Sequence, residues 1–231
     1  MQQAPKKRTR RVKTKFDDDK SHITLVPKTE KQKDYIEALN EASQVVVFGP
    51  SGTGKTYVVS TYAASLYHTK QIDKIVITRP HVAVGKDLGY LKGDLEDKTK
   101  PWALPVLDVL EEHLGKGVVD TGIKNGNIEI APLALMRGRS FNNAFIICDE
   151  TQNITFHELK MLLTRVGEGT KLVLNGDIMQ SDLKEADGLS KIVHLVKKYM
   201  LPVPIVEFEV DDIIRSSMTK MWVECFVKEG I

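Results

Sequence analysis

The chain alternates between short apolar runs and longer amphipathic stretches. The apolar runs are rich in β-branched residues, as strands are, and cover Val45–Phe48, Lys74–Thr78, Asn127–Ile130, Ala144–Cys148, Lys171–Leu174 and Ile205–Phe208. Most of the stretches between them have helical periodicity, over Thr56–His68, Pro101–Leu114, Phe156–Val166 and Leu189–Met200. The runs from Val45 and from Phe145 are continuously apolar, as strands covered on both faces must be. The pattern predicts an α/β fold, with a mostly parallel sheet and helices on both faces.

Polar positions indicate two helix starts and one long loop. Thr29 followed by Gln32 fits a capping box, and apolar residues then follow at helical spacing. Thr155 with Glu158 forms a second capping box, and Gly167 is placed to end that helix. Residues 80–100 contain three glycines and four lysines without a clear period, so we expect a long loop there.

The composition is that of one ordinary domain preceded by a basic arm. With 231 residues, 42% of them hydrophobic and 28% charged, the chain is long enough to bury a substantial core. Residues 1–15 carry seven Lys or Arg and no acid, so the overall net charge of +2 leaves −5 for the rest. We therefore expect a flexible basic arm over residues 1–26 and a single domain over residues 27–231.

The sequence has the features of a cytoplasmic protein without a membrane partner. No run of eighteen apolar residues occurs, and no apolar stretch follows the basic amino terminus, so neither a membrane span nor a secretory signal is expected. Cys148 and Cys225 lie far apart in apolar runs, which predicts two buried thiols in a reducing compartment.

Candidate chemistry begins directly after the first predicted strand. The chain there matches the P-loop pattern G-x-x-x-x-G-K-[ST] in full and then opens a helix; the residues are Gly49, Pro50, Ser51, Gly52, Thr53, Gly54, Lys55 and Thr56. The glycines let successive backbone N–H groups point at phosphate oxygens, and the helix amino terminus adds its positive dipole end. Lys55 is expected to reach the β- and γ-phosphates, and the Thr56 hydroxyl to ligate magnesium. ATP and Mg²⁺ are therefore the expected ligands.

Two acids and a glutamine follow later strands. Asp149 and Glu150 end the strand before them, and ligands of parallel sheets bind beyond the carboxyl ends of the strands. Asp149 is a candidate for magnesium contact and Glu150 for the base that takes a proton from the attacking water. Acids also begin ordinary loops, and the P-loop upstream favours the catalytic interpretation. Gln180 ends the run Gly176-Asp177-Ile178-Met179-Gln180, where an amide can touch the γ-phosphate.

Taken together, these motifs resemble those of the PhoH family of ATPases, a relative of superfamily 1 helicases. Besides the P-loop, the matching segments are Ile77–Pro80, Ile130–Arg139, Asp149–Asn153, Leu163–Arg165, Gly176–Gln180 and Asp212–Ser216. The resemblance extends over residues 27–228. It implies a single RecA-like core that works as a hexameric, RNA-remodelling ATPase.

The resemblance also implies roles for single side chains. Gln32 stands where related helicases hold a glutamine that contacts the adenine edge. Gln152 and Gln180 match glutamines that sense the γ-phosphate. Arg215 matches a late arginine of the family and is a candidate arginine finger, although a surface arginine at a helix start is the other interpretation.

A single core of this type leaves the γ-phosphate exposed on one side. The residues from 205 to 231 are too few to build a second domain. We therefore expect a neighbouring subunit to close the site, with Arg215 or Arg165 acting from that neighbour. A head-to-tail interface of this kind builds a homo-oligomeric ring or a filament.

Single-stranded RNA or DNA is the expected macromolecular partner. The arm could neutralise at most about seven phosphates without selecting a base sequence, although a merely solubilising arm explains it nearly as well. Arg79, Arg137 and Arg139 are the candidate nucleic-acid contacts, whereas Arg137 and Arg139 could instead pair with acids such as Asp94 or Glu96. The leading hypothesis is an oligomeric ATPase that remodels single-stranded nucleic acid. A P-loop kinase and a nucleotide-gated scaffold are the alternatives.

Overall fold

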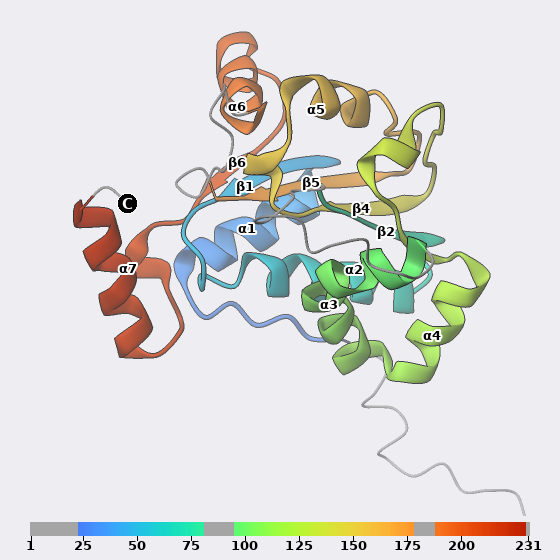
Figure 1. The fold of residues 1–231 in the computed structure, drawn as a ribbon, viewed down its shortest axis with the longest axis horizontal. Helices are drawn as coiled ribbons and strands as arrows, with labels where there is room; N and C mark the ends of the chain where they lie inside the picture. The colour runs from blue at the N-terminus through green and yellow to red at the C-terminus, as the bar shows by residue number, and fades with distance from the viewer. Residues whose placement is uncertain (1–22, 81–94, 178–187, 230–231) are drawn as a thin grey trace, which may run out of the picture.

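The computed structural model describes residues 23–80, 95–177 and 188–229. Its elements are, in chain order, α1 (Glu30–Glu41), β1 (Gln44–Phe48), α2 (Lys55–His68), β2 (Lys74–Thr78), α3 (Leu95–Leu114), α4 (Lys116–Asn125), β3 (Ile128–Ile130), η2 (Leu133–Met136), β4 (Ala144–Cys148), η3 (Thr151–Asn153), α5 (Phe156–Leu163), β5 (Lys171–Gly176), α6 (Gly188–Tyr199), β6 (Ile205–Glu207), η5 (Val210–Asp212) and α7 (Ser217–Glu229). The strands within these ranges form one parallel sheet in the order β3-β2-β4-β5-β1-β6 (Figure 1). The predicted α/β fold is confirmed.

Helices cover both faces of the sheet because its central strands are apolar on both sides. Val45 and Val47 of β1 join the core beneath α1 to α4, whereas Val46 and Phe48 join the core beneath α5 and α6. Figure 1 shows these two groups of helices on opposite sides of the sheet. Each buried side chain of this size contributes about 1.5–3 kcal/mol. The two cores together hold the carboxyl ends of the strands in fixed positions.

Side-chain caps set the starts of two helices. The Thr29 hydroxyl accepts a hydrogen bond from the Gln32 backbone N–H at 3.1 Å, as the first capping box predicted. In a complete capping box the Gln32 side chain would accept from the backbone N–H of Thr29. It accepts from the backbone N–H of Lys28, at 2.8 Å. At α5 the predicted capping box of Thr155 and Glu158 forms completely.

Several expectations about helices and loops are corrected. The segment 80–100 is not all loop, because α3 begins at Leu95; residues 81–94 lie outside the described ranges. Helix α5 ends at Leu163, and Gly167 donates its N–H to the Phe141 carbonyl instead of ending that helix. Helices α4 and α7 were not predicted. In α4 two glycines weaken the helical pattern, and packing of Ile128 against Gly122 helps to hold it in place.

The two ends of the described chain bear on the predicted arm and on the predicted burial of Cys225. Ile23 and Leu25 pack against the core beneath α1 to α4, while the division into an arm and a domain stays a prediction. Cys148 is buried as predicted, but Cys225 is exposed on α7, which corrects its assignment to the interior. None of the helices in the described ranges combines the length and the apolar character needed to cross a membrane.

Candidate nucleotide-binding site

The P-loop connects the carboxyl end of β1 to the first turn of α2. Gly49, Gly52 and Gly54 have positive φ angles of 141°, 90° and 84°, a backbone conformation that favours glycine. A Cβ atom at Gly49 would collide with the Phe208 carbonyl oxygen, and one at Gly54 would collide with the Gln32 side chain. Gly54, the residue before α2, has no side chain that could cap the first turn of the helix. The N–H groups of this turn can therefore bind an anion.

Lys55 is buried against the loop that carries it. Its Nζ atom donates hydrogen bonds to the carbonyl oxygens of Gly49 at 2.7 Å and Pro50 at 2.9 Å, and to the Thr53 hydroxyl at 3.4 Å. Burial lowers the pKa of this amine, and three carboxylates at the ends of β4 and β5 act in the opposite direction. Phosphate oxygens could take the place of the carbonyl oxygens as partners of the ammonium group.

Asn175, at the end of β5, joins the P-loop to the end of β4. Its side-chain Nδ2 donates to the Thr56 hydroxyl at 3.0 Å and to the Asp149 carboxylate at 2.6 Å. The side chain is buried, and its Oδ1 has no hydrogen-bond partner among the described residues. This residue was not predicted. A polar residue that ends an otherwise apolar strand, directly before Gly176, was the available indication.

The ionised form of the Asp149 carboxylate is less stable than that of an ordinary aspartate. Burial, and next the charge of Glu150, raise its pKa to about 6, while Arg79 and Lys55 oppose the shift. A desolvated carboxylate costs free energy unless it is paired with a cation. The electrostatics at this end of β4 therefore favour binding of a positive charge.

The donor set suits magnesium bound together with phosphates. The Thr56 hydroxyl and the Asp149 carboxylate are hard oxygen donors, and both lie within hydrogen-bond distance of the same Asn175 nitrogen. Within the described ranges, no group of three or more His, Cys, Asp or Glu side chains could hold a metal ion by itself. Magnesium at this place would complete its shell with water and phosphate oxygens.

Glu150 is held by two neighbours. It has a positive φ of 53°, and its carboxylate contacts Arg79 at 3.5 Å and accepts from the Gln152 amide at 2.6 Å. The Gln152 Oε1 atom in turn accepts from the backbone N–H of Asp177 at 2.9 Å. Gln152 thus connects the end of β4 to the segment that leads toward Gln180. Gln180 itself lies outside the described residues, so its role stays a prediction.

Gln32 connects α1 to the P-loop. Its side-chain amide donates to the Thr53 carbonyl at 2.9 Å while its Oε1 accepts from Lys28, and the residue is buried. It also lines the nucleotide cavity. Contact with an adenine edge stays a prediction, and in the structure the amide supports the loop.

Arg215 lies against the P-loop of its own chain. The preceding residue, Ile214, donates its N–H to the Gly52 carbonyl at 3.1 Å. A Cβ atom at Gly52 would come within 3.1 Å of the Arg215 side chain. Arg215 therefore lies beside the site of its own subunit, and the expected action on a neighbouring subunit's site stays a prediction. Residues 208–215 return the chain to the P-loop, which brings this arginine to the same subunit's site.

These residues surround a cavity of about 440 Å³, within the usual range for a small-molecule site. The lining residues are Leu25, Val26, Lys28, Gln32, Ser51, Gly52, Gly54, Lys55, Thr56, Tyr57, Val58, Pro105, Asp149, Glu150, Asn175, Gly176, Asp177, Ile214 and Arg215. The cavity lies beyond the carboxyl ends of β1, β4 and β5, as predicted for ligands of a parallel sheet.

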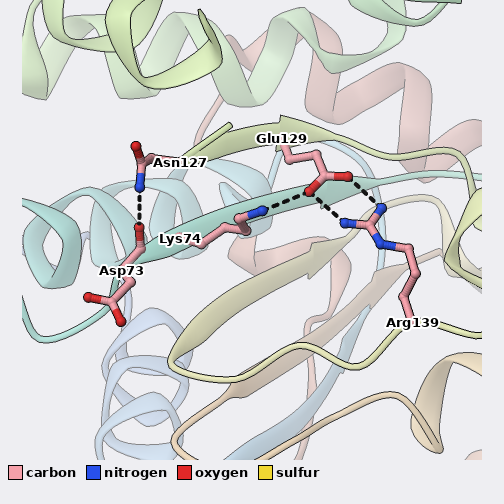
Figure 2. A network of polar contacts seen from close by, with 5 residues as sticks. All are labelled: Asp73, Lys74, Asn127, Glu129 and Arg139. Carbon is pink, nitrogen blue, oxygen red and sulfur yellow. Dashed lines mark hydrogen bonds and ion pairs between the residues drawn. The ribbon is translucent and has the colours of Figure 1, made fainter. Parts of the chain in front are cut away.

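Arg139 belongs to a separate polar network near β2 and β3, which Figure 2 shows. Its guanidinium forms a two-point ion pair with Glu129 at 2.5 and 2.8 Å and lies over the Phe141 ring. Lys74 donates to the same carboxylate at 3.0 Å. Arg139 therefore pairs with an acid, as the structural alternative anticipated, but the acid is neither Asp94 nor Glu96.

The remaining arginines occupy three different environments. Arg79 contacts Glu150 and so lies at the nucleotide site, whereas Arg137 is exposed in the connection between β3 and β4. Arg165 lies beside the chain that enters β4, at the opposite edge of the sheet, where Phe141 donates to its carbonyl oxygen. Within residues 23–80, 95–177 and 188–229, the buried Nε atom of Arg165 has no hydrogen-bond partner. Nucleic-acid contacts by Arg79, Arg137 and Arg139 stay predictions.

A glycine loop between a strand and a helix, a buried lysine, and a Thr–Asn–Asp group beyond the carboxyl ends of a parallel sheet define a P-loop nucleotide-binding protein with a RecA-like core. Comparison with known proteins narrows this class. The family model described as PhoH-like protein matches residues 24–227. The chain belongs to the PhoH family, so the resemblance drawn from the motifs is confirmed.

Named relatives are similar over most of the chain. A PhoH-like protein of Mycobacterium tuberculosis (strain ATCC 25618 / H37Rv) is 38% identical over 207 residues, which cover 89% of this chain and 58% of the relative. A PhoH-like protein of Bacillus subtilis (strain 168) is 37% identical over 88% of this chain and 64% of the relative. Protein PhoH of Escherichia coli (strain K12) is 37% identical over 87% and 58%, respectively. The chain therefore spans about three fifths of the length of these relatives.

Proposed function

We propose that this chain binds ATP with Mg²⁺ and hydrolyses it in the cavity beside the P-loop. The observation that carries the proposal is the Asn175 side chain, which joins the Thr56 hydroxyl of the P-loop to the Asp149 carboxylate of β4. Glu150 follows directly on the same strand end. The groups that would hold a metal-bound triphosphate and activate a water thus meet at one edge of the sheet.

Binding of the phosphates would use the P-loop backbone and Lys55. The N–H groups of the loop and of the first turn of α2 bind the phosphate oxygens, while Lys55 exchanges carbonyl partners for phosphate oxygens. Thr56 and Asp149 would hold magnesium, which would supply positive charge to offset the charge of the phosphates. Arg215, against Gly52 of the same chain, adds a further positive charge at the outer side of the loop.

Hydrolysis transfers the γ-phosphoryl group to water. The water oxygen forms a bond to the γ-phosphorus as the bond from phosphorus to the β–γ bridging oxygen breaks, and ADP leaves with that electron pair. The Glu150 carboxylate takes the proton of the attacking water. Its present partners, Arg79 and Gln152, hold this carboxylate in place, and Gln152 also links it to the backbone N–H of Asp177. Loss of the γ-phosphate can then be transmitted to Asp177.

We further propose that the protein is a homo-oligomer, a hexameric ring, that couples hydrolysis to remodelling of single-stranded nucleic acid, RNA in particular. Membership of the PhoH family supports this proposal. So does the exposed Arg137 in the connection between β3 and β4, together with the seven basic residues of the amino-terminal segment. The position of Arg215 changes one part of it, because the arginine finger would act within its own subunit.

The test measures ADP and phosphate in parallel, with and without poly(U) or single-stranded DNA. We expect equal amounts of the two products, faster release with the polynucleotide, no turnover by Lys55→Ala, and ATP binding without turnover by Glu150→Gln. Lys116→Ala, an exposed lysine at the start of α4, is the matched control. ADP formation without free phosphate would indicate a kinase. Phosphate release that ignores every polynucleotide would overturn the nucleic-acid part.

A further inference from the structure

The last helix, α7, presents an apolar stripe to solvent. Met218, Met221, Trp222, Cys225 and Phe226 are all exposed, with 58% of Trp222 and 45% of Phe226 accessible. Their spacing of three and four residues is that of a helix face that is buried against another surface. The two aromatic rings stack with centroids 5.8 Å apart.

The chain itself leaves this stripe uncovered in the described structure. The main contact of α7 is with the short helix η5, and Figure 1 shows α7 set apart from the helices that cover the sheet. An apolar patch on one helix face, next to a polar rim, is typical of a protein interaction site. The stripe needs an apolar, concave partner.

An apolar cavity of about 130 Å³ lies between α6 and the amino-terminal parts of β1 and β5. All but one of its lining residues are apolar, the exception being Gln44. The cavity reaches the surface at Leu201, which is 47% exposed. The two residues before it, Tyr199 and Met200, are 61% and 88% exposed. This part of the surface is apolar both inside the cavity and beside it.

Charge distinguishes the partners that α7 can take. Residues 205–229 carry six acids and three bases, a net charge of −3, and this excess lies in residues 205–216, directly before α7, which is itself neutral. Acidic surroundings oppose a polyanion, so stacking of nucleic-acid bases on Trp222 is disfavoured. Residues 188–204 carry three lysines and no acid, a net charge of +3, and Lys191, Lys197 and Lys198 are all exposed. The surface around the α6 cavity is thus opposite in charge to the segment that carries α7.

We infer that the α7 stripe of one chain inserts into the α6 cavity of a second copy of this chain. The inference rests on the proposed homo-oligomer and names the surfaces that build it. The surfaces lie at opposite edges of the sheet, because α7 follows η5 beyond the carboxyl ends of the strands while the cavity is at their amino-terminal parts. Contact between unlike surfaces is head-to-tail, so it repeats into a ring or a filament.

The interface also begins next to the nucleotide site. Ile214, whose N–H binds the Gly52 carbonyl of the P-loop, precedes the first residue of α7 by three positions. The contact between subunits and the P-loop are therefore connected through a very short segment of chain.

The test uses one variant for each surface and a matched control. Trp222→Ser combined with Phe226→Ser removes the aromatic pair, and Leu201→Glu places a carboxylate at the mouth of the cavity. Val118→Ser, at an exposed position on α4, is the control. Mass is measured by native mass spectrometry and by sedimentation at several protein concentrations.

We expect the wild type and the control to assemble and each surface variant to be monomeric alone. An equal mixture of the two surface variants should give a heterodimer that grows no further, because only one intact α7 can meet one intact cavity. All variants should keep the ATP affinity of the wild type. A wild type that does not bind ATP would contradict the proposed function and leave the interface untouched.

Three outcomes would overturn the inference. Assembly that survives Leu201→Glu but not the α7 substitutions would mean that α7 pairs with another α7. A wild type that stays monomeric at every concentration would mean that another occupant covers the stripe. Poly(U) binding that is lost on substitution of Trp222 and Phe226 would assign the stripe to nucleic acid.

Discussion

Replacing Asn175 with alanine removes two hydrogen bonds that one buried amide makes. Its Nδ2 lies 2.6 Å from the Asp149 carboxylate and 3.0 Å from the Thr56 hydroxyl. A hydrogen bond to a charged group contributes about 1.5–3 kcal/mol. Since about 1.4 kcal/mol is a factor of ten, the magnesium-dependent kcat/KM for ATP should fall roughly ten- to a hundredfold.

The assay titrates Mg²⁺ at saturating ATP and measures nucleotide binding separately in EDTA. Because Asn175 orients the two expected metal donors and not the phosphate cradle, the midpoint of the Mg²⁺ titration should rise while binding in EDTA changes little. Asn175→Thr keeps one hydroxyl donor and should recover part of the loss. Asn127→Ala is the control, since that amide binds the Asp73 carbonyl at the other edge of the sheet (Figure 2).

An unchanged Mg²⁺ titration for Asn175→Ala would refute the reasoning. So would an equal loss of binding in EDTA and in Mg²⁺, which would indicate that the side chain only supports the fold. Thermal unfolding of the variant, measured in parallel, separates these two cases.

Three other predictions follow from the site and its surroundings. Burial beside a second carboxylate raises the pKa of Asp149 to about 6, so Mg²⁺-dependent ATP binding should weaken about tenfold per pH unit below that value. In the nucleotide-free protein the same shift should stabilise the fold below the unfolded pKa of about 3.9 and lose this effect as pH rises through about 6, a dependence that Asp149→Asn should remove in unfolding measurements. If Arg215 acts within its own subunit, a mixture of Arg215→Ala with Lys55→Ala chains should regain no ATPase activity; recovery in the mixture would show action between subunits. Hydrogen bonds from Arg139 lower the pKa of Glu129, so Glu129→Gln should reduce the free energy of unfolding by about 1 kcal/mol at neutral pH, a value limited by the partial exposure of the pair. That difference should be present above the ordinary Glu pKa and disappear as pH falls through the lowered one; equal stability of the two proteins at pH 7 would contradict it.

Much of the fold and the P-loop follow from local pattern. Strands such as Ala144–Cys148 are apolar at every position, and the segment Gly49–Thr56 needs specific residues at specific places for steric reasons. Such features are set by residues that are close together in the sequence, so they can be predicted from the sequence alone. The acids after β4 could be predicted for a related reason, since the carboxyl ends of parallel strands lie at one edge.

The parts that escaped prediction depend on contacts between distant segments. The partners of Asn175 follow from the parallel pairing of β5 with β1 and β4, which its own strand does not reveal. Arg139 was assigned to nucleic acid or to other acids, because the position of Glu129 beside it depends on the path of the chain between β3 and β4. The approach of Arg215 to the P-loop of its own chain could not be predicted, because hydrophobic periodicity does not indicate that residues 208–215 return to that loop.

The central claim is that one P-loop, through its backbone amides and Lys55, binds a metal-bound triphosphate. It is tested most directly by calorimetric titration of the purified chain with ATP in Mg²⁺, for the wild type and for Lys55→Ala. Charge-assisted hydrogen bonds to phosphate contribute about 1.5–3 kcal/mol. The account predicts one ATP per chain for the wild type and an affinity roughly ten- to a hundredfold weaker for the variant. Absence of binding by the wild type, or equal affinities of the two proteins, would contradict it.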